Sequence, residues 1–445
     1  MFENKKVLIL GFARSGYEAA KLLAKKGNIV ILNDMKTEQD KDKMDELESL
    51  GVKIVLGSHP DDLLDDSFDY LIKNPGVPID HKYVLKAREL GVEVINEVEM
   101  AYRLLPKDVK LVGITGTNGK TTTTTLVYEF LIKDGRRAHL TGNIGFPLCS
   151  FLDKLQKDDI IVMETSCQQL ENLTKFNPDI AVMTNLSPAH IDFLKSYDNY
   201  KRVKTKIFQN HIEKNVAILN MENGDVMDST KNIKSTVKYF SSKNEINGCY
   251  IKDNSIYYYD EKIVELNDVK LIGIHNYENI MAAIMVVKEL GVSNESIKAV
   301  LKDFNGVEHR IEFVRELNGK KFYNDSKATN IKATQTALSA FTNPVVILLG
   351  GLERGQDFNE LKDFMEYVKY IVSFGQCRSR VEEFAKSLNI ECSVVETLKE
   401  AVDIANNVST SGDTVLLSPA SASWDQYKCF EDRGTEYKEI VNSYN

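Results

Sequence analysis

Apolar residues in this chain of 445 residues gather in short unbroken runs, and longer segments with helical spacing separate them. Strands that are buried on both faces of a parallel sheet have such continuous Val, Ile and Leu runs, whereas half-exposed strands alternate. The pattern therefore predicts an α/β fold with parallel sheets. The expected strands include residues 7–10, 29–32, 109–114, 160–163, 180–183, 216–219, 345–349, 370–374 and 414–417, and the expected helices include residues 17–26, 122–133 and 280–290.

The length of the chain corresponds to roughly three domains. We expect a Rossmann-like N-terminal domain at residues 1–100, a central P-loop ATPase-type α/β domain at 101–306 and a C-terminal Rossmann-like α/β domain at 307–445. Short β-rich pieces at residues 235–272 surround a turn at 253–255, which predicts a small extra antiparallel sheet or hairpin in the central domain. A surface insertion without function explains this segment equally well.

Composition narrows the function classes. With 43% hydrophobic and 27% charged residues, the chain has the composition of an ordinary globular protein. A net charge of −9 argues against a general nucleic-acid surface. The six cysteines lack the spacing of a zinc site, so reduced thiols are expected. No signal peptide or membrane span is visible, and we expect a cytoplasmic protein.

The segment GITGTNGKT at residues 113–121 follows an apolar run and precedes a helical segment. Glycines in such a loop let backbone N–H groups approach phosphates, and the helix N-terminus adds its positive dipole end. Lys120 is then expected to reach the β- and γ-phosphates, and Thr121 to offer its hydroxyl to Mg²⁺. The first glycine lies one residue earlier than in the strict P-loop pattern, and an ordinary glycine-rich turn is the alternative.

The first domain has a related loop, GFARSG at residues 11–16. Ala13 replaces the second glycine of the dinucleotide pattern, so a nucleotide or sugar-nucleotide phosphate at Ser15 and Gly16 is favoured over a dinucleotide. The alternative is a purely structural turn between a strand and a helix. A rigid turn at residues 74–78 follows another expected strand, and ligands gather at such strand ends.

Polar residues follow several expected strands. Glu164 ends an apolar run and is a candidate Mg²⁺ ligand, with an exposed strand-end carboxylate as the alternative. His190 follows the next strand and is a candidate ligand or a structural histidine, while Lys204 would by default be a solvated helix lysine. Asn276 and Asn279 share one helical face, where they could contact adenine or cap the helix.

The third segment contributes charged residues of its own. Arg310 could stabilise a transferring phosphoryl group. Asp325 and Lys327 follow an expected strand, and burial of both charges without partners would be costly, so a polar site is favoured.

Taken together, these segments resemble the Mur ligases, the ATP-dependent amide-forming enzymes of peptidoglycan synthesis. The resemblance covers nearly the whole chain, because five motifs match in order: residues 115–122, 164–166, 185–192, 275–279 and 309–310. Residues 324–330, 418–427 and 430–434 are most similar to the members that add D-glutamate to UDP-N-acetylmuramoyl-L-alanine. The resemblance implies an ATP-dependent acid–D-amino-acid ligase with two Mg²⁺ ions, expected to be a cytoplasmic monomer without nucleic-acid or membrane partners.

The resemblance also implies roles for matched positions. Catalysis would fall to Lys120, His190 and Lys204, with Lys204 carbamylated and Lys206 as the rival position. Metal ions would be bound by Thr121, Glu164, His190 and Lys204. ATP would be bound by Gly116, Thr117, Asn118, Gly119, Lys120, Thr121, Thr122, Asn276, Asn279, Arg310, Asp325 and Lys327. The UDP-substrate would be bound by Ser15, Gly16, Asp34, Gly76 and Asn143, and D-glutamate by Thr329, Arg354, Ser423 and Phe430.

Two positions depart from the family pattern. Ala189 stands where many relatives have an acid, and Arg354 stands where some have lysine. A guanidinium binds a carboxylate in a bidentate manner, so Arg354 suits the D-glutamate side chain. Two rival functions stay open at this point: a non-catalytic nucleotide switch and a ligase of the same family that adds another amino acid.

Overall fold

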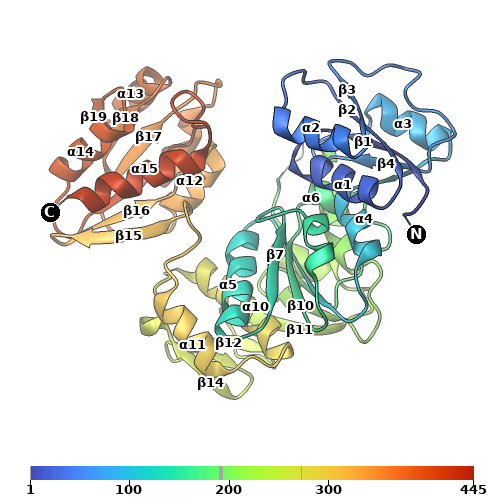
Figure 1. Ribbon diagram of the computed structural model, residues 1–445. Helices are drawn as coiled ribbons and strands as arrows, with labels where there is room; N and C mark the ends of the chain where they lie inside the picture. The colour runs from blue at the N-terminus through green and yellow to red at the C-terminus, as the bar shows by residue number, and fades with distance from the viewer. Residues whose placement is uncertain (1, 190–193, 272, 445) are drawn as a thin grey trace. The chain divides into compact units, whose positions relative to one another are not determined.

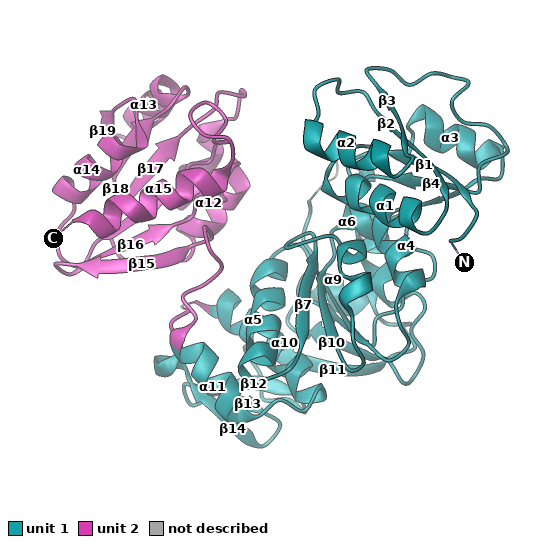
Figure 2. Cartoon of the chain, viewed as in Figure 1, with its two compact units in different colours: residues 1–269, 274–302 teal, residues 270–273, 303–445 magenta. Residues whose placement is uncertain are grey.

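The computed structural model of the chain describes residues 2–189, 194–271 and 273–444. It divides into two compact units, residues 1–269 with 274–302 and residues 270–273 with 303–445 (Figure 2). The first unit contains two β-sheets and the second contains one, which confirms the α/β fold class (Figure 1). The domain boundaries at residues 100 and 306 stay predictions, because the first two sheets group into one unit.

The N-terminal sheet has the order β3-β2-β1-β4-β5, and all its strands are parallel. The apolar runs form its central strands because both faces are covered by helices. Its strands are β1 (Lys6–Leu10), β2 (Ile29–Asp34), β3 (Lys53–Leu56), β4 (Tyr70–Lys73) and β5 (Glu93–Ile95). Its helices are α1 (Arg14–Lys25), α2 (Lys41–Ser49), α3 (Lys82–Glu89) and α4 (Glu97–Leu104).

The central sheet has nine strands in the order β14-β13-β12-β11-β10-β9-β6-β8-β7. They are β6 (Lys110–Thr115), β7 (Ala138–Gly142), β8 (Ile160–Glu164), β9 (Ile180–Met183), β10 (Val216–Asn220), β11 (Thr236–Ser241), β12 (Cys249–Lys252), β13 (Ser255–Tyr258) and β14 (Glu261–Glu265). Its helices include α5 (Lys120–Lys133), α6 (Cys167–Leu170), α8 (Tyr197–Thr205), α9 (Gly224–Ser229), α10 (Ile274–Glu289) and α11 (Asn294–Asp303). Short 3₁₀ helices lie at η1 (Leu148–Ser150), η2 (Leu152–Lys154), η3 (Lys206–Phe208) and η4 (Leu266–Asp268).

The predicted β-rich segment at residues 235–272 contains the expected antiparallel pairing, β12 with β13 and β13 with β14. It does not lie apart as a sheet of its own. β12 pairs with β11, and β11 pairs with β10, so the segment extends the central sheet at one edge.

The C-terminal sheet has the order β15-β16-β20-β17-β18-β19, and only β15 runs antiparallel to its neighbour. Its strands are β15 (Glu312–Leu317), β16 (Lys320–Asn324), β17 (Val345–Gly350), β18 (Val368–Phe374), β19 (Glu391–Val394) and β20 (Thr414–Leu417). Its helices are α12 (Ile331–Leu338), α13 (Arg378–Ser387), α14 (Leu398–Val408) and α15 (Phe430–Ser443), with a 3₁₀ helix at η5 (Phe358–Phe364).

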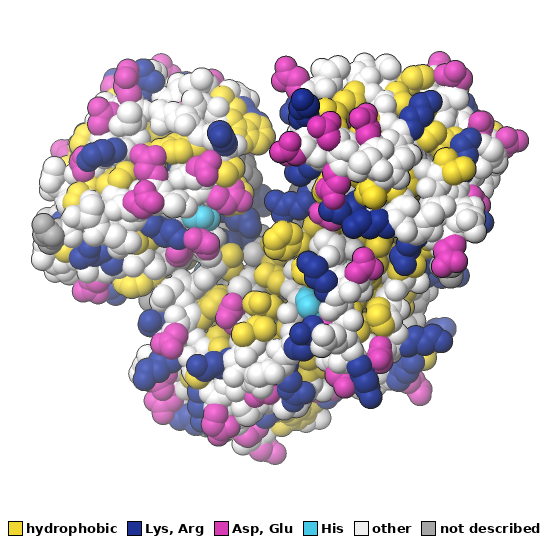
Figure 3. Space-filling view, viewed as in Figure 1, with side chains coloured by type: hydrophobic (Ala, Val, Ile, Leu, Met, Phe, Trp, Pro, Cys, Tyr) yellow, Lys and Arg dark blue, Asp and Glu magenta, His cyan; other side chains and the backbone are white. Residues whose placement is uncertain are grey.

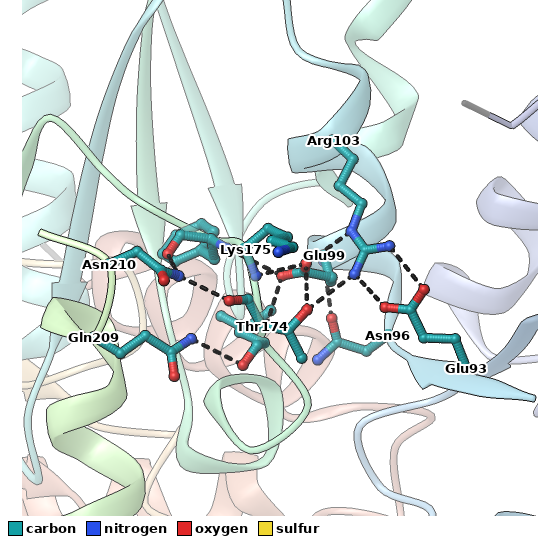
Figure 4. A network of polar contacts seen from close by, with 10 residues as sticks. Glu93, Asn96, Glu99, Arg103, Thr174, Lys175, Gln209 and Asn210 are labelled. Atoms are coloured by element: carbon teal, nitrogen blue, oxygen red, sulfur yellow. Dashed lines mark hydrogen bonds and ion pairs between the residues drawn. The ribbon is translucent and has the colours of Figure 1, made fainter. Parts of the chain in front are cut away.

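A buried carboxylate joins the first two sheets into one unit. Glu99 on α4 has no exposed surface and accepts hydrogen bonds from the backbone N–H groups of Thr174, Lys175 and Phe176 (Figure 4). Arg103, one turn further along α4, donates to Glu99 at 2.8 Å. One hydrophobic cluster also includes residues of both sheets and of α4. The two sheets therefore share a core and a satisfied polar network.

Acidic and basic side chains are interspersed over the face drawn in Figure 3, as the modest net charge leads one to expect. All six cysteines are free. Across the described residues, no helix is both long and apolar enough to cross a membrane.

Candidate functional site

The phosphate loop connects β6 to α5, and two of its glycines are required by their surroundings. Gly119 has a φ of +79°, and a Cβ there would lie 2.0 Å from the Oδ1 atom of Asn279. Gly116 has a φ of +148°, and a Cβ there would lie 2.0 Å from the Oγ1 atom of Thr184. A side chain at either position would strain the backbone and would also collide with Asn279 or Thr184, which pack against the loop.

The residues after β9 hold this loop in place. The N–H groups of Thr117 and Asn118 donate to the backbone and side-chain oxygens of Asn185, at 2.8 and 2.9 Å. Thr184 donates its hydroxyl to the carbonyl of Asn118 at 2.6 Å. Because β9 lies beside β6 in the sheet, the ends of the two strands meet at the same edge. The loop is thus preorganised by its neighbour.

Helix α5 begins at Lys120, two residues earlier than the sequence predicts, because Gly119 provides the left-handed turn before it. The Lys120 ammonium donates to the carbonyl of Thr117 at 2.8 Å, across the loop. Thr121 and Thr122 are buried in the first turn of the helix. A cation, a helix N-terminus and hydroxyl groups therefore surround the place where phosphates bind in such loops.

Lys204 on α8 is not the solvated lysine that composition alone predicts. Its side chain is 1% exposed, and its ammonium donates to the Thr115 hydroxyl at 3.0 Å and to the Gly116 carbonyl at 2.9 Å. Burial lowers the pKa of Lys204 well below its ordinary value, and the nearby Lys120 lowers it further. The rival position, Lys206, points elsewhere and donates to the carbonyl of Glu171.

Glu164 ends β8 next to the loop and is 2% exposed, which excludes the alternative of an exposed strand-end carboxylate. Its Oε1 atom accepts from the Asn143 amide at 2.8 Å, whereas its Oε2 atom is buried without a hydrogen-bond partner among the described residues. A buried carboxylate oxygen without a hydrogen-bond partner, next to a phosphate loop, can serve as a ligand for a hard cation. Glu164 and Thr121 therefore suit a Mg²⁺ ion chemically.

His190 lies outside the described residues. In the part of the chain that the structure describes, no three His, Cys, Asp or Glu side chains form a metal-binding group. Asn276 and Asn279 both lie in the first turns of α10, which begins before the expected residue 280. Asn279 is buried against Gly119, so it lines the phosphate loop.

In the second unit, Asp325 follows β16 and is almost fully buried. It accepts from the Ser418 hydroxyl at 2.7 Å and from the N–H of Ile311 at 3.2 Å. Burial raises the pKa of Asp325 to about 7, although Ser418 and Arg310 act in the opposite direction. The Nζ atom of Lys327 lies 5.7 Å from the centre of the Phe430 ring.

The residues assigned to D-glutamate lie in the segments that follow β16, β17 and β20 of the C-terminal sheet. Ser423 is 1% exposed, and its hydroxyl has no hydrogen-bond partner among the described residues. Arg354 is exposed and stacks on Trp424, with 4.5 Å between its guanidinium carbon and the ring centre. Phe430 begins α15, and Thr329 is half-buried just before α12.

Four of the five residues assigned to the UDP-substrate, Ser15, Gly16, Asp34 and Gly76, lie at or just after the carboxyl ends of β1, β2 and β4, whereas Asn143 follows β7 in the central sheet. Asp34 accepts from the N–H of Phe12 at 2.7 Å, and Asn74 donates its amide to the Ser15 hydroxyl at 3.0 Å. The Gly76 N–H donates back to the Asn74 side chain at 3.1 Å. A Cβ at Gly16 would lie 2.0 Å from the Gly11 carbonyl, so the two loop glycines pack closely.

Three family models match successive stretches of the chain. Residues 5–96 match the Mur ligase MurD-like N-terminal domain, residues 114–287 the Mur ligase middle domain, and residues 309–421 the Mur ligase glutamate ligase domain. The UDP-N-acetylmuramoylalanine–D-glutamate ligase of Enterococcus hirae is 46% identical over 446 residues, which cover 99% of this chain and 96% of that protein. The chain belongs to the Mur ligase family.

Similarity to further proteins supports the assignment to this family. The UDP-N-acetylmuramoylalanine–D-glutamate ligase of Geobacillus kaustophilus is 43% identical to this Mur ligase over 444 residues, covering 99% of the chain and 98% of the relative. Among solved structures, the UDP-N-acetylmuramate–alanine ligase MurC of Thermotoga maritima has a TM-score of 0.59 at 19% identity, with 99% of each chain covered. A pseudomurein peptide ligase of Methanothermus fervidus has a TM-score of 0.57 at 19% identity, again over 99% of each chain. At this identity, the structures support the fold alone.

Two supporting side chains, one in each unit, were not expected from the sequence. The Tyr200 hydroxyl lies 2.9 Å from that of Thr117, so it supports the phosphate loop from α8. Arg433 is fully buried and donates to Ser326 and to the Ser421 carbonyl, while its Nη1 atom has no partner among the described residues. Neither position has a local pattern that marks it, since a helical tyrosine and a helical arginine are usually packing or surface residues.

Proposed function

We propose that this Mur ligase joins D-glutamate to the L-alanine carboxylate of UDP-N-acetylmuramoyl-L-alanine and uses ATP to drive the reaction. The observation that carries this proposal is the 46% identity over the full length to an enzyme named for that reaction. The orphaned Ser423 hydroxyl and the exposed Arg354 guanidinium support an amino-acid pocket in the second unit. The product is a peptidoglycan precursor.

The chemistry follows from the substrates. A carboxylate is a poor acyl donor, so the terminal phosphoryl group of ATP is first transferred to the L-alanine carboxylate, and ADP is released. The amine of D-glutamate then attacks this acyl phosphate, the C–N bond forms, and the C–O bond to phosphate breaks. In this proposal Lys120 and the N-terminus of α5 neutralise the phosphates, and Asn279 and Asn276 line the nucleotide.

We infer that two Mg²⁺ ions assist the transfer, one held by Thr121 and Glu164 and the other by His190 and a carbamylated Lys204. Bound Mg²⁺ would supply charge neutralisation at the phosphates. The unpaired Glu164 oxygen supports the first position. A carbamate at Lys204 would replace an ammonium by an anionic oxygen ligand, and the low pKa of this amine supports that modification.

The remaining assignments belong to the same proposal. Arg310, Asp325 and Lys327 act on the nucleotide, and Thr329, Arg354, Ser423 and Phe430 bind D-glutamate. Ser15, Gly16, Asp34, Gly76 and Asn143 bind the UDP-substrate. We place the enzyme in the cytoplasm as a monomer without nucleic-acid or membrane partners, and size-exclusion chromatography tests the monomer.

The decisive experiment measures phosphate release from ATP in the presence of UDP-N-acetylmuramoyl-L-alanine and one amino acid at a time. We expect release with D-glutamate and none with L-glutamate, L-lysine or meso-diaminopimelate. A preference for meso-diaminopimelate would overturn the choice of amino acid but leave the family intact. ATP binding without release for any amino acid would instead support a non-catalytic nucleotide switch.

A further inference from the structure

Lys73, the last residue of β4, is a buried cation that the proposed reaction does not use. Its side chain is 1% exposed, and lysine is rarely buried to this degree unless its charge is paired. Among the described residues its ammonium makes one hydrogen bond, to the Val77 carbonyl at 2.8 Å. An ammonium has three N–H donors, so two of them have no partner in the described part of the chain.

The surroundings of Lys73 do not neutralise its charge. Glu171 is the acidic group that acts on it electrostatically, but no ion pair within 4.0 Å joins the two in the described residues, and the Glu171 Oε2 atom is itself buried without a hydrogen-bond partner. Burial lowers the pKa of Lys73 to about 8. An apolar side chain of similar length would therefore serve folding better than this lysine does.

The hydrogen bond that Lys73 donates to Val77 fixes a turn at the expected substrate site. The bond spans residues 73–77, and within this turn the Val77 N–H donates to the Asn74 carbonyl at 3.0 Å. The Asn74 amide in turn donates to the Ser15 hydroxyl at 3.0 Å. Since β4 pairs with β1, the turn and the loop before α1 lie side by side at the carboxyl edge of the sheet (Figure 1).

We propose that Lys73 is a positioning residue for the diphosphate of the UDP-substrate. It holds the turn at residues 74–77 against Ser15, and its positive charge favours the doubly charged diphosphate at this edge of the sheet. This inference rests on the proposed function, because that function supplies the diphosphate. It explains why a costly buried charge stands where the sheet could have an apolar residue.

The test compares the binding of UDP and of uridine to the full chain by titration calorimetry. Lys73→Met keeps the length of the side chain but removes its charge and its donors. We expect it to bind UDP about tenfold more weakly, while its affinity for uridine changes less than twofold. In steady-state assays, KM for UDP-N-acetylmuramoyl-L-alanine should rise, and KM for ATP and D-glutamate should not.

Lys53→Met is the matched control. Lys53 is the exposed first residue of β3 in the same sheet, so it lies at the amino end of its strand, whereas the substrate is expected at the carboxyl ends. The variant therefore makes the same change in net charge away from the site. It should bind UDP as the unchanged protein does. If Lys73→Met unfolds, Lys73→Gln takes its place, since it removes the charge but keeps a donor, and the same difference between UDP and uridine is expected.

Three outcomes would overturn the inference: a folded Lys73 variant that binds UDP with unchanged affinity, equal losses for UDP and uridine, or the same loss in Lys53→Met. Equal losses would mean that Lys73 shapes the pocket without acting on the diphosphate. None of these outcomes touches the proposed function, because D-glutamate-dependent phosphate release by the unchanged protein tests that separately.

Discussion

Lys204 shows what burial does to a single residue. A lysine whose ammonium is enclosed by the phosphate loop has a depressed pKa, so a larger fraction of it is the neutral amine that can add CO₂. We expect Lys204→Ala to lose nearly all ligase activity and to regain part of it when acetate or formate is added. Phosphate release in the presence of D-glutamate measures both effects.

Lys201→Ala is the control for this prediction, because Lys201 lies on the same helix and pairs with Asp198 and Asp225 near the surface. It should keep activity within a few-fold. Full activity of Lys204→Ala without added carboxylates would show that the amine only supports the loop.

Asp325 makes the stability of the protein depend on pH. Its pKa is raised from 3.8 to about 7, so the folded protein binds this proton more tightly than the unfolded chain does. Between about pH 4 and about pH 7, Asp325 is ionised in the unfolded chain but still protonated in the folded protein. The free energy of unfolding therefore falls as the pH rises over this range, and it does not recover above it. Asp325→Asn should gain stability relative to the unchanged protein over this range, by on the order of 1 kcal/mol or more.

Urea unfolding at a series of pH values checks this expectation. Asp413→Asn is the control with the opposite sign, since desolvation at Asp413 is outweighed by Lys369 and Thr410 and the pKa is lowered. Its relative stability should change only at acid pH, where the ionised Asp413 of the unchanged protein becomes protonated. A difference for Asp325→Asn that stays constant from pH 4 to pH 8 would contradict the raised pKa.

At the residue scale, the residues of the phosphate loop could be predicted from the sequence, but the side chains that contact them could not. The glycines and Lys120 are recognisable because their spacing is local, and Glu164 because it ends an apolar run. Tyr200 and Lys73 contribute through contacts with residues far along the chain or through burial, and neither is visible in a linear pattern.

At the scale of elements, helix α4 decides whether the first two sheets act as one unit. Glu99→Gln would replace a carboxylate that accepts from three backbone N–H groups by an amide whose NH₂ group would oppose at least one of them. We expect the free energy of unfolding to fall by about 3 kcal/mol. Urea unfolding monitored by circular dichroism measures the change.

Glu93→Gln is matched to this variant, since Glu93 also pairs with Arg103 but has a side chain that is 44% exposed. It should cost less than about 1 kcal/mol. Equal losses in the two variants would show that the contacts of Arg103, and not the backbone bonds of Glu99, hold α4 in place.

The elements themselves were largely predictable, because unbroken apolar runs identify buried parallel strands. Their ends were less so. The expected start of α5 was two residues late, and α10 begins six residues before the expected residue 280, at Ile274, because polar residues in a first helical turn resemble a loop. The pairing of β11 with β10 also escaped prediction, since strand order in a sheet depends on contacts between distant residues.

At the scale of the whole molecule, described residues form one large hydrophobic cluster within the first unit and two within the second. We expect scanning calorimetry to resolve two unfolding transitions. A non-hydrolysable ATP analogue with Mg²⁺ should raise the midpoint of one of them, because the phosphate loop belongs entirely to the first unit.

Two variants identify the transitions. Glu99→Gln should lower the midpoint of the transition that the nucleotide raises, and Asp325→Asn at pH 8 should raise the other. A single transition that shifts as a whole in every case would show that the units unfold cooperatively.

The hairpin that ends the central sheet has a consequence for the behaviour of the protein at high concentration. β14 leaves one edge of a nine-stranded sheet open, and an open edge is a template on which another chain could add a strand. Its sequence, EKIVE, places the exposed charges of Glu261, Lys262 and Glu265 around two buried apolar residues. A second chain that docked there would have to desolvate these charges, so the edge resists aggregation although the sheet behind it is long.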